Sequence, residues 1–211
     1  GDGIGKDVTA EAVKVLEAIG ERSGRPLTLE TLPWSADHYL ATGETLPANG
    51  YDLLRGFDAV FVGALGDPRV PDNRHARDIL LGARFELDLY VNYRPVRLLA
   101  DHLCPLKDRG RADIDFVVFR ENTEGVYVSV GGRFKAGTPD EVAIQEEINT
   151  YKGVHRIIRH AFEYASANGL TRVCMADKSN AMQQGHALWQ RVFREVAAEY
   201  PAVTATHQYI D

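Results

Sequence analysis

Strand-like and helix-like segments alternate along this chain of 211 residues, and this alternation constrains the fold more than any other feature. Apolar residues recur at helical spacing over residues 7–20, 74–84, 151–168 and 186–200, with a short amphipathic turn at 51–57. Apolar or alternating runs predict strands at residues 27–32, 59–62, 88–96, 115–119, 172–176 and 203–210. The pattern predicts an α/β fold with a mostly parallel sheet, in which 59–62 is a buried strand.

Charge and cysteine content exclude several classes of protein. Lys and Arg number 24 and Asp and Glu number 30, which gives a formal charge of −6. An acidic chain without a basic run is poorly suited to grip a nucleic-acid backbone. No apolar stretch approaches the roughly 18 residues that a membrane span needs. The two cysteines, Cys104 and Cys174, exclude a disulfide scaffold and a cysteine-rich zinc module and suit a reducing, cytoplasmic compartment.

Both ends of the sequence indicate a piece of a longer protein. The sequence opens with Gly1 and not with Met, and it closes at Asp211 directly after a predicted strand. We therefore expect a further segment beyond the given sequence. Without that segment, the apolar run 59–62 should expose its side chains.

The glycine-rich opening at residues 1–5 (GDGIG) resembles two phosphate-binding motifs but satisfies neither. The Rossmann fingerprint needs its third glycine three residues after the second, and here the interval is two. The acidic residue expected after the next strand is also absent. A phosphate loop needs Ser or Thr after its lysine, but Lys6 is followed by Asp7. The opening therefore does not predict a standard dinucleotide fold.

Three arginines occupy positions where an open α/β sheet places ligands. Arg84 ends a predicted helix, Arg94 lies where a strand ends, and Arg120 follows the apolar strand 115–119. Guanidinium groups bind carboxylates through two parallel hydrogen bonds. One such arginine is usually a salt bridge at the rim of the sheet, but three favour an anionic substrate.

Three further residues carry reactive groups near predicted strand ends. Lys178 follows the strand 172–176 and is either a surface cation or a site lysine whose environment tunes its proton affinity. Tyr127 lies just past Arg120 and could donate a proton. Asp211 ends the last strand, a typical place for a carboxylate ligand of Mg²⁺ or Mn²⁺. The residues alone predict a site for a small polycarboxylate with a divalent metal.

Five ordered motifs resemble those of the metal-dependent decarboxylating dehydrogenases, the isocitrate and 3-isopropylmalate dehydrogenase family. They are GDGIG at 1–5, Arg84 with NYRP at 92–95, RENTEG at 120–125, DKSN at 177–180 and HQYID at 207–211. The resemblance implies a two-domain, non-Rossmann α/β fold with domains at 1–97 and 98–211. It also implies a homodimer with shared active sites and a β-hairpin arm near 125–147. The alternating, glycine-containing pattern of that segment independently predicts a hairpin.

The resemblance also implies the roles of individual residues. Arg84, Arg94 and Arg120 would hold a carboxylate of the substrate, and Tyr127 and Lys178 would transfer protons. Asp211 would bind Mg²⁺ or Mn²⁺, and Ile4 and Asn180 would contact NAD. The adenosine-binding segment is outside this sequence, so NADP remains an alternative.

The resemblance implies that the substrate is a malate-type 2-hydroxy acid, whose substituent would face the helix before Arg84. Leu80 and Leu81 lie four and three residues before that arginine, on its predicted face. Asp78 and Leu80 occupy positions where isocitrate enzymes place Ser and Asn, which disfavours a third carboxylate. Two subgroups of the family are resembled in different segments. The tartrate/D-malate dehydrogenases are resembled at residues 90–97, 70–72 and 130–133, and the 3-isopropylmalate dehydrogenases at residues 177–178 and 207–209. A non-catalytic binding subunit is a further alternative, although it would often lack Tyr127 or Lys178.

Overall fold

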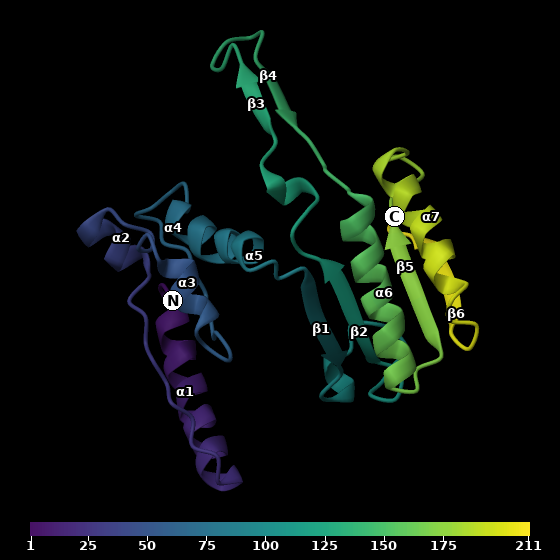
Figure 1. Ribbon diagram of the computed structural model, residues 1–211, viewed down its shortest axis with the longest axis horizontal. Helices are drawn as coiled ribbons and strands as arrows, with labels where there is room; N and C mark the ends of the chain where they lie inside the picture. Colours follow the sequence, from purple (N-terminus) through teal and green to yellow (C-terminus); the bar gives the residue numbers. More distant parts are fainter. The chain divides into compact units, whose positions relative to one another are not determined.

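The computed structural model describes residues 1–211, which divide into two compact units, Gly1–Asp88 and Leu89–Asp211 (Figure 1). The division falls before β1 (Val91–Arg97), whereas the sequence placed the domain boundary after this strand, at residue 97. The physical reason is strand pairing, since β1 forms its whole ladder with β2 (Asp115–Glu121) of the second unit. No helix is both long and apolar enough to cross a membrane.

The first unit consists of helices joined by extended segments. Its elements are α1 (Ile4–Ser23), α2 (Ala36–Thr42), α3 (Gly50–Arg55), α4 (Arg74–Arg77), the π-helical turn η1 (Asp78–Gly82) and α5 (Ala83–Glu86). The strands predicted at 27–32 and 59–62 do not form. Phe61 is 58% exposed, which agrees with the prediction that the run 59–62 exposes its side chains in the sequence as given. A strand needs a neighbouring backbone to bond with, and residues 1–88 supply none to these segments.

The second unit contains every strand. Its elements are β1, the 3₁₀ turn η2 (Asp101–Leu103), β2, the 3₁₀ turn η3 (Val126–Val128), β3 (Gly131–Phe134), β4 (Val142–Gln145), α6 (Tyr151–Ala167), β5 (Arg172–Asp177), α7 (Gly185–Ala197) and β6 (Thr204–Tyr209). The pairs β1–β2 and β3–β4 are antiparallel, and only β5–β6 is parallel. The prediction of a mostly parallel sheet is therefore wrong. The link from β1 to β2 lacks the helical crossover that parallel pairing requires, whereas α7 supplies one between β5 and β6.

The core of the second unit lies between α6 and α7. Val154, Ile158 and Phe162 lie along one face of α6 at helical spacing and are buried. They pack in one cluster with Val192 and Val196 of α7 and with residues of β5. Thr150 caps α6 by accepting a hydrogen bond from the Gly153 N–H. The helices predicted at 151–168 and 186–200 are thus confirmed, since their apolar faces meet in this core.

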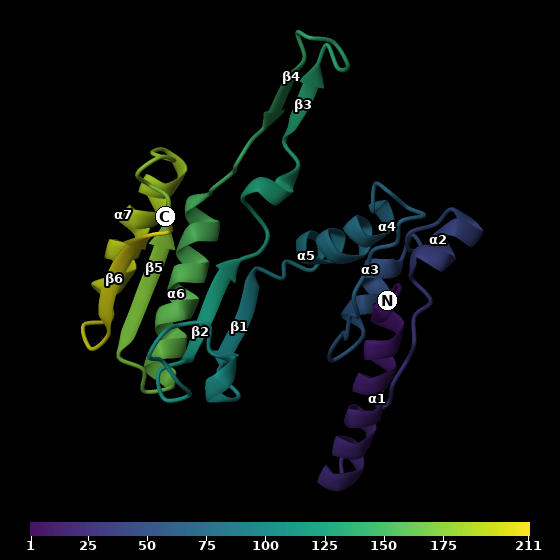
Figure 2. The same ribbon diagram turned by 180° about the vertical axis from the view of Figure 1, so that it is seen from behind.

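A gap separates β2 from β5, because no ladder joins these strands. Both views in Figures 1 and 2 show α6 lying along this gap. A cavity of about 810 Å³ occupies it, lined mainly by apolar side chains that include Val117, Phe119, Met175 and Trp189. The polar part of its lining includes Arg120, Tyr127 and Asp177, so the cavity reaches residues of the predicted site.

Candidate functional site

The parallel register of β5 and β6 brings three predicted site residues together. Asp177 lies opposite Tyr209, and the Ile210 N–H donates to the Asp177 carbonyl oxygen at 2.8 Å. The two strand ends therefore lie side by side, and the Lys178 Nζ is 2.7 Å from the Asp211 Oδ2. The Asn180 amide nitrogen lies 3.5 Å from the other oxygen of Asp211.

This ion pair sits at the solvent boundary and is open to a ligand. The side chains of Lys178 and Asp211 are both substantially exposed. The hydrogen bond from Lys178 lowers the pKa of the Asp211 carboxyl, so the carboxylate is charged at neutral pH. The exposed position screens the attraction, and the pair contributes little to stability. The pair thus presents an amine and a carboxylate that both remain available to a bound molecule.

Asp177, just before this lysine, is buried and holds the lysine loop, residues 177–180. Its Oδ1 accepts from the Ser179 N–H at 2.9 Å and lies 3.0 Å from the His207 Nε2. Burial alone would raise the pKa of Asp177, but the Ser179 and His207 hydrogen bonds lower it overall. In the motif DKSN, the buried Asp177 therefore fixes the conformation of the loop, and the exposed Lys178 remains available for reaction.

Arg94 and Arg120 lie on one face of the β1–β2 ladder. Arg120 is directly opposite Asn92, and Arg94 follows Asn92 by two residues, so alternation puts all three side chains on the same face. The neighbouring pair Tyr93 and Phe119 points to the other face, where Phe119 contacts Tyr164 of α6. The two predicted substrate arginines are thus brought together on the face turned away from α6.

Neither of these two guanidinium groups is paired with a carboxylate. Arg94 donates from Nε to the Asn92 Oδ1 at 2.6 Å, and Arg120 lies over the Tyr127 ring at 5.1 Å from its centroid. Farther along the same ladder, Arg97 does have an acidic partner in Asp115. A salt bridge at the rim of the sheet therefore does not explain Arg94 and Arg120. Their arrangement leaves two positive charges and a phenol available to an anion.

The remaining predicted substrate residues lie in the first unit. Arg84 belongs to α5, and Leu80 and Leu81 are half-buried in the π-helical turn η1. The prediction of one α-helix over 74–84 is wrong here, because a π turn holds more residues than an α-helical turn. The spacing that would stack Leu80 over Arg84 in an α-helix is therefore changed.

Tyr51 accounts for the local geometry of this turn. Its hydroxyl donates to the Asp78 carbonyl oxygen at 2.9 Å, at the start of η1. The same hydroxyl lies where a β-carbon on Gly82 would project, so only glycine fits at that position. The Asp78 carboxylate accepts from the Thr45 hydroxyl at 2.8 Å.

The glycine-rich opening forms the start of α1, and Ile4 in its first turn is 67% exposed. Gly3 has a backbone φ of 48°, a value that residues other than glycine rarely adopt. A β-carbon on Gly5 would clash with the Ala64 backbone, so this glycine permits close approach of a neighbouring segment. The exposed Ile4 is accessible to a cofactor.

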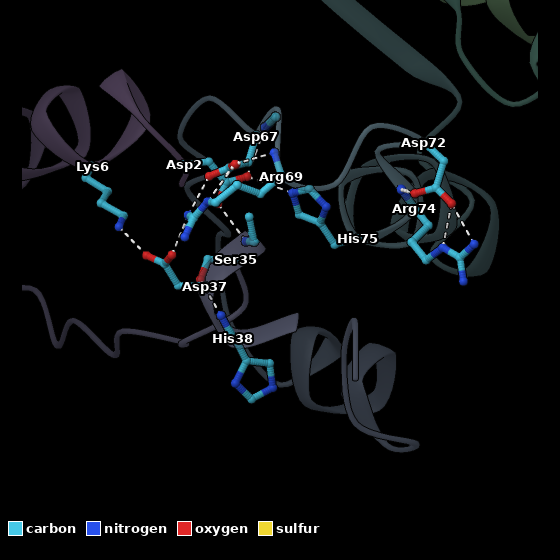
Figure 3. A network of polar contacts seen from close by, with 12 residues as sticks. Asp2, Lys6, Ser35, Asp37, His38, Asp67, Arg69, Asp72, Arg74 and His75 are labelled. Carbon is cyan, nitrogen blue, oxygen red and sulfur yellow. Dashed lines mark hydrogen bonds and ion pairs between the residues drawn. The ribbon is translucent and has the colours of Figure 1, made fainter. Parts of the chain in front are cut away.

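A buried carboxylate that the sequence reading missed ties this opening to three other segments (Figure 3). Asp2, which is 3% exposed, accepts from the Ala36 N–H at 2.7 Å and the Gly66 N–H at 2.9 Å. Its Oδ2 also lies 2.8 Å from the Nε2 of His75, which is fully buried. Burial opposes ionisation of Asp2, but the hydrogen bonds from Ala36, Gly66 and His75 lower its pKa overall. An acidic residue between two glycines was the only signal in the sequence.

Ion pairs surround this carboxylate at the surface. Asp37 pairs with Lys6 and Arg69, and Arg69 also pairs with Asp67 at 2.6 Å (Figure 3). Hydrogen bonds from Arg69 lower the pKa of Asp67 to about 2. Because the cations are well exposed, these pairs orient the loops more than they stabilise them.

Asp211 is the only predicted ligand for the divalent metal ion in this chain. Asp211 offers the hard carboxylate oxygen that Mg²⁺ and Mn²⁺ prefer. Among residues 1–211, no three His, Cys, Asp or Glu side chains are gathered in a way that could hold a metal ion. Asp211 therefore fits as one member of a ligand set that needs further donors.

Comparison with known proteins gives a consistent set of matches. The family model described as isocitrate/isopropylmalate dehydrogenase matches residues 1–211. The chain is 44% identical to 3-isopropylmalate dehydrogenase of Thermobifida fusca and 43% identical to D-malate dehydrogenase [decarboxylating] of Escherichia coli. The whole chain aligns in both cases, and it covers 60% and 59% of these relatives, respectively.

A solved structure supports the same fold. The crystal structure of isocitrate dehydrogenase from Methylococcus capsulatus matches the whole chain with a TM-score of 0.79 at 29% identity. The chain covers 59% of that structure. The mixed α/β fold with a hairpin is therefore that of its relatives, and the chain spans about 60% of their length.

Replacing Asp2 by Asn tests the buried carboxylate. An amide cannot accept at both positions where Asp2 receives hydrogen bonds, so we expect Asp2→Asn to lower the free energy of unfolding by about 1–3 kcal/mol at pH 7. Because the folded-state pKa is lowered, Asp2 stabilises the fold above its unfolded-state pKa of about 4 and loses this effect as pH falls below that value.

Urea unfolding of the full-length protein between pH 7 and 3 measures both effects. The variant should lose less stability on acidification than the unmodified protein. Glu17→Gln, at an exposed position on α1, is the control and should leave the urea midpoint unchanged. Equal behaviour of the two variants would contradict the role assigned to Asp2.

Proposed function

Because the chain belongs to the isocitrate/isopropylmalate dehydrogenase family, we propose that the full-length protein oxidatively decarboxylates a malate-type 2-hydroxy acid. The reaction would use NAD and a divalent metal ion, and D-malate or tartrate is the proposed substrate. The observation that carries this proposal is the pair Arg94 and Arg120, which share one sheet face without a carboxylate partner. Two such guanidinium groups suit a dicarboxylate.

The arginines would bind and orient the substrate. Arg94 and Arg120 would each donate hydrogen bonds to the carboxylate that later leaves as CO₂. Arg84 would supply a third guanidinium group, as the family resemblance implies. Asn92 already orients Arg94 through its Nε, which leaves the terminal nitrogens of that guanidinium group for the ligand. Fixed donors of this kind lower the entropy cost of reaching the reactive geometry.

Lys178 and Tyr127 would transfer protons in the first and the last step of the reaction, respectively. Lys178 Nζ would accept the proton from the 2-hydroxyl group, directly or through a relay. Tyr127 Oη would protonate the carbon atom from which CO₂ has departed. The contact of the Tyr127 ring with Arg120 holds the phenol beside the arginine that binds the departing carboxylate. Both residues would be catalytic groups under this proposal.

The cofactors would be held by residues on strand and helix ends. Asp211 would be one metal ligand, and Ile4 and Asn180 would contact the nicotinamide cofactor. When bound, Mg²⁺ or Mn²⁺ would polarise the substrate oxygen, and NAD would accept the hydride. NADP remains an alternative to NAD.

The side chains before Arg84 bear on the choice of substrate. The Asp78 carboxylate would repel a third carboxylate, which disfavours isocitrate. A small substituent, as in D-malate or tartrate, avoids that repulsion. The half-buried Leu80 and Leu81 favour one alternative, 3-isopropylmalate, because they offer apolar surface to a branched alkyl group.

A homodimer is the proposed assembly. The β3–β4 hairpin exposes Phe134, Val142 and Ile144, although hairpins in water usually keep such side chains covered. A second copy of the chain would bury them if the hairpins pair as arms. Lys178 and Asp211 would then serve the active site of the neighbouring subunit, as the family resemblance implies.

A substrate panel on the full-length protein tests the proposed function. NADH absorbance is followed with Mn²⁺ and K⁺ present, offering D-malate, tartrate, 3-isopropylmalate and isocitrate, with NAD⁺ and NADP⁺ in turn. We expect NADH formation with D-malate or tartrate. Turnover of 3-isopropylmalate alone would assign the alternative substrate. No turnover of any of the four acids by a folded dimer would contradict the proposed substrates and favour another substituted malate or a binding subunit.

Replacing Lys178 by Met tests the proton transfer. The change removes the amine while keeping most of the side-chain volume, and we expect kcat to fall by about 10²–10⁴-fold with a smaller change in KM. Lys14→Met is the matched control, because Lys14 is an exposed lysine that pairs with Glu11 on α1. Steady-state kinetics measures both variants. An active Lys178→Met protein would refute the role of this lysine.

A further inference from the structure

The imidazole of His186 joins two segments that are far apart in the sequence. His186 lies in the first turn of α7, and its side chain is mostly buried. Its Nδ1 accepts a hydrogen bond from the backbone N–H of Lys178 at 2.8 Å. Its Nε2 lies 3.1 Å from the Oε1 of Glu147, in the segment between the hairpin and α6.

These two contacts require one tautomer of the ring. A backbone N–H only donates, so the Nδ1 that receives it carries no proton. A neutral imidazole with an unprotonated Nδ1 has its proton on Nε2, which then donates to the Glu147 carboxylate. Glu147 thereby selects the tautomer that can accept from Lys178.

The other backbone group of Lys178 is also fixed. Its carbonyl oxygen accepts from the N–H groups of Ala181 and Met182 at 3.0 and 2.8 Å. With His186 on the N–H group, both peptide groups flanking the Lys178 α-carbon are held. The side chain of Lys178 is then the part of the residue that is left to move, and it reaches Asp211.

We propose that His186 is a positioning residue that, in its Nε2–H tautomer set by Glu147, fixes the backbone of Lys178 for proton transfer. This inference rests on the proposed function, in which Lys178 accepts the proton of the 2-hydroxyl group. His186 touches no reacting atom and acts through Lys178. A displacement of about 1 Å at a reacting group can slow an enzyme by about 10²-fold, so the anchor has a measurable consequence.

Two substitutions separate the two nitrogen atoms of the ring. In His186→Asn, the side-chain Oδ1 takes the place of Nδ1 and can still accept from the Lys178 N–H. In His186→Gln, the terminal amide reaches the place of Nε2 and can still donate to Glu147, but no acceptor faces Lys178. Both variants lose the ring, so a merely structural role would affect them alike.

Kinetics and hydrogen exchange of the full-length protein distinguish them. We expect His186→Gln to lower kcat by about 10–100-fold with little change in KM, and His186→Asn to stay within about threefold of the unmodified enzyme. Exchange of the Lys178 amide hydrogen should be faster in the Gln variant than in the Asn variant. The corresponding substitutions at His102, an exposed position in η2, are controls and should change neither quantity.

The tautomer is measured without reference to activity. In protein labelled with ¹⁵N-histidine, the His186 resonances should show a protonated Nε2 and an unprotonated Nδ1. The opposite tautomer would overturn the proposal, as would equal kcat values for the Gln and Asn variants. If these fail while Lys178→Met is inactive, the proposed function survives and only the role of His186 is lost. An active Lys178→Met enzyme would overturn both.

Discussion

The parallel pairing of β5 with β6 is the constraint on which the candidate site depends. Its register sets Asp177 opposite Tyr209, so that Lys178, one residue after the first, and Asp211, two residues after the second, emerge from neighbouring strand ends. Both views show the C-terminus beside the end of β5 (Figures 1 and 2). A shift by one residue would turn each side chain to the opposite face of the sheet and separate the amine from the carboxylate. The α6–α7 core holds this register, because β5 packs against it.

In each unit, a buried carboxylate fixes a loop that carries predicted site residues. Asp2 in the first unit and Asp177 in the second are buried carboxylates that accept from a backbone N–H and from a histidine Nε2. In both, these hydrogen bonds outweigh burial and lower the pKa of the carboxyl group. Moving either carboxylate would break these hydrogen bonds and leave a buried charge without them, although the Oδ2 of Asp177 is buried without a partner even here. Lys178 and Ile4, each within two residues of such an acid, are positioned while their own side chains stay exposed.

Sequence periodicity predicted the parts of the fold that pack locally. The helices α6 and α7 were predicted closely because their apolar faces meet within one unit. The segment 59–62 was predicted as a strand from its apolar residues, but it finds no partner within residues 1–88. The π turn at Asp78–Gly82 receives a hydrogen bond from the hydroxyl of Tyr51, a contact that spacing does not reveal. The roles of His186 and Asp2 likewise depend on contacts between distant segments. The sequence placed Arg94 and Arg120 at strand ends, whereas both lie within the ladder of β1 and β2, and only its register shows that they share one face.

The stoichiometry of CO₂ release tests the central claim of an oxidative decarboxylation most directly. D-malate labelled with ¹³C at C4 is converted by the full-length protein with NAD⁺ and Mn²⁺, and labelled CO₂ and NADH are measured in the same sample. Oxidation at C2 makes the C4 carboxylate β to the new carbonyl group, so the account predicts one labelled CO₂ for each NADH, with pyruvate as the other product. NADH formed without labelled CO₂ would contradict the account, since the enzyme would then oxidise its substrate without decarboxylating it.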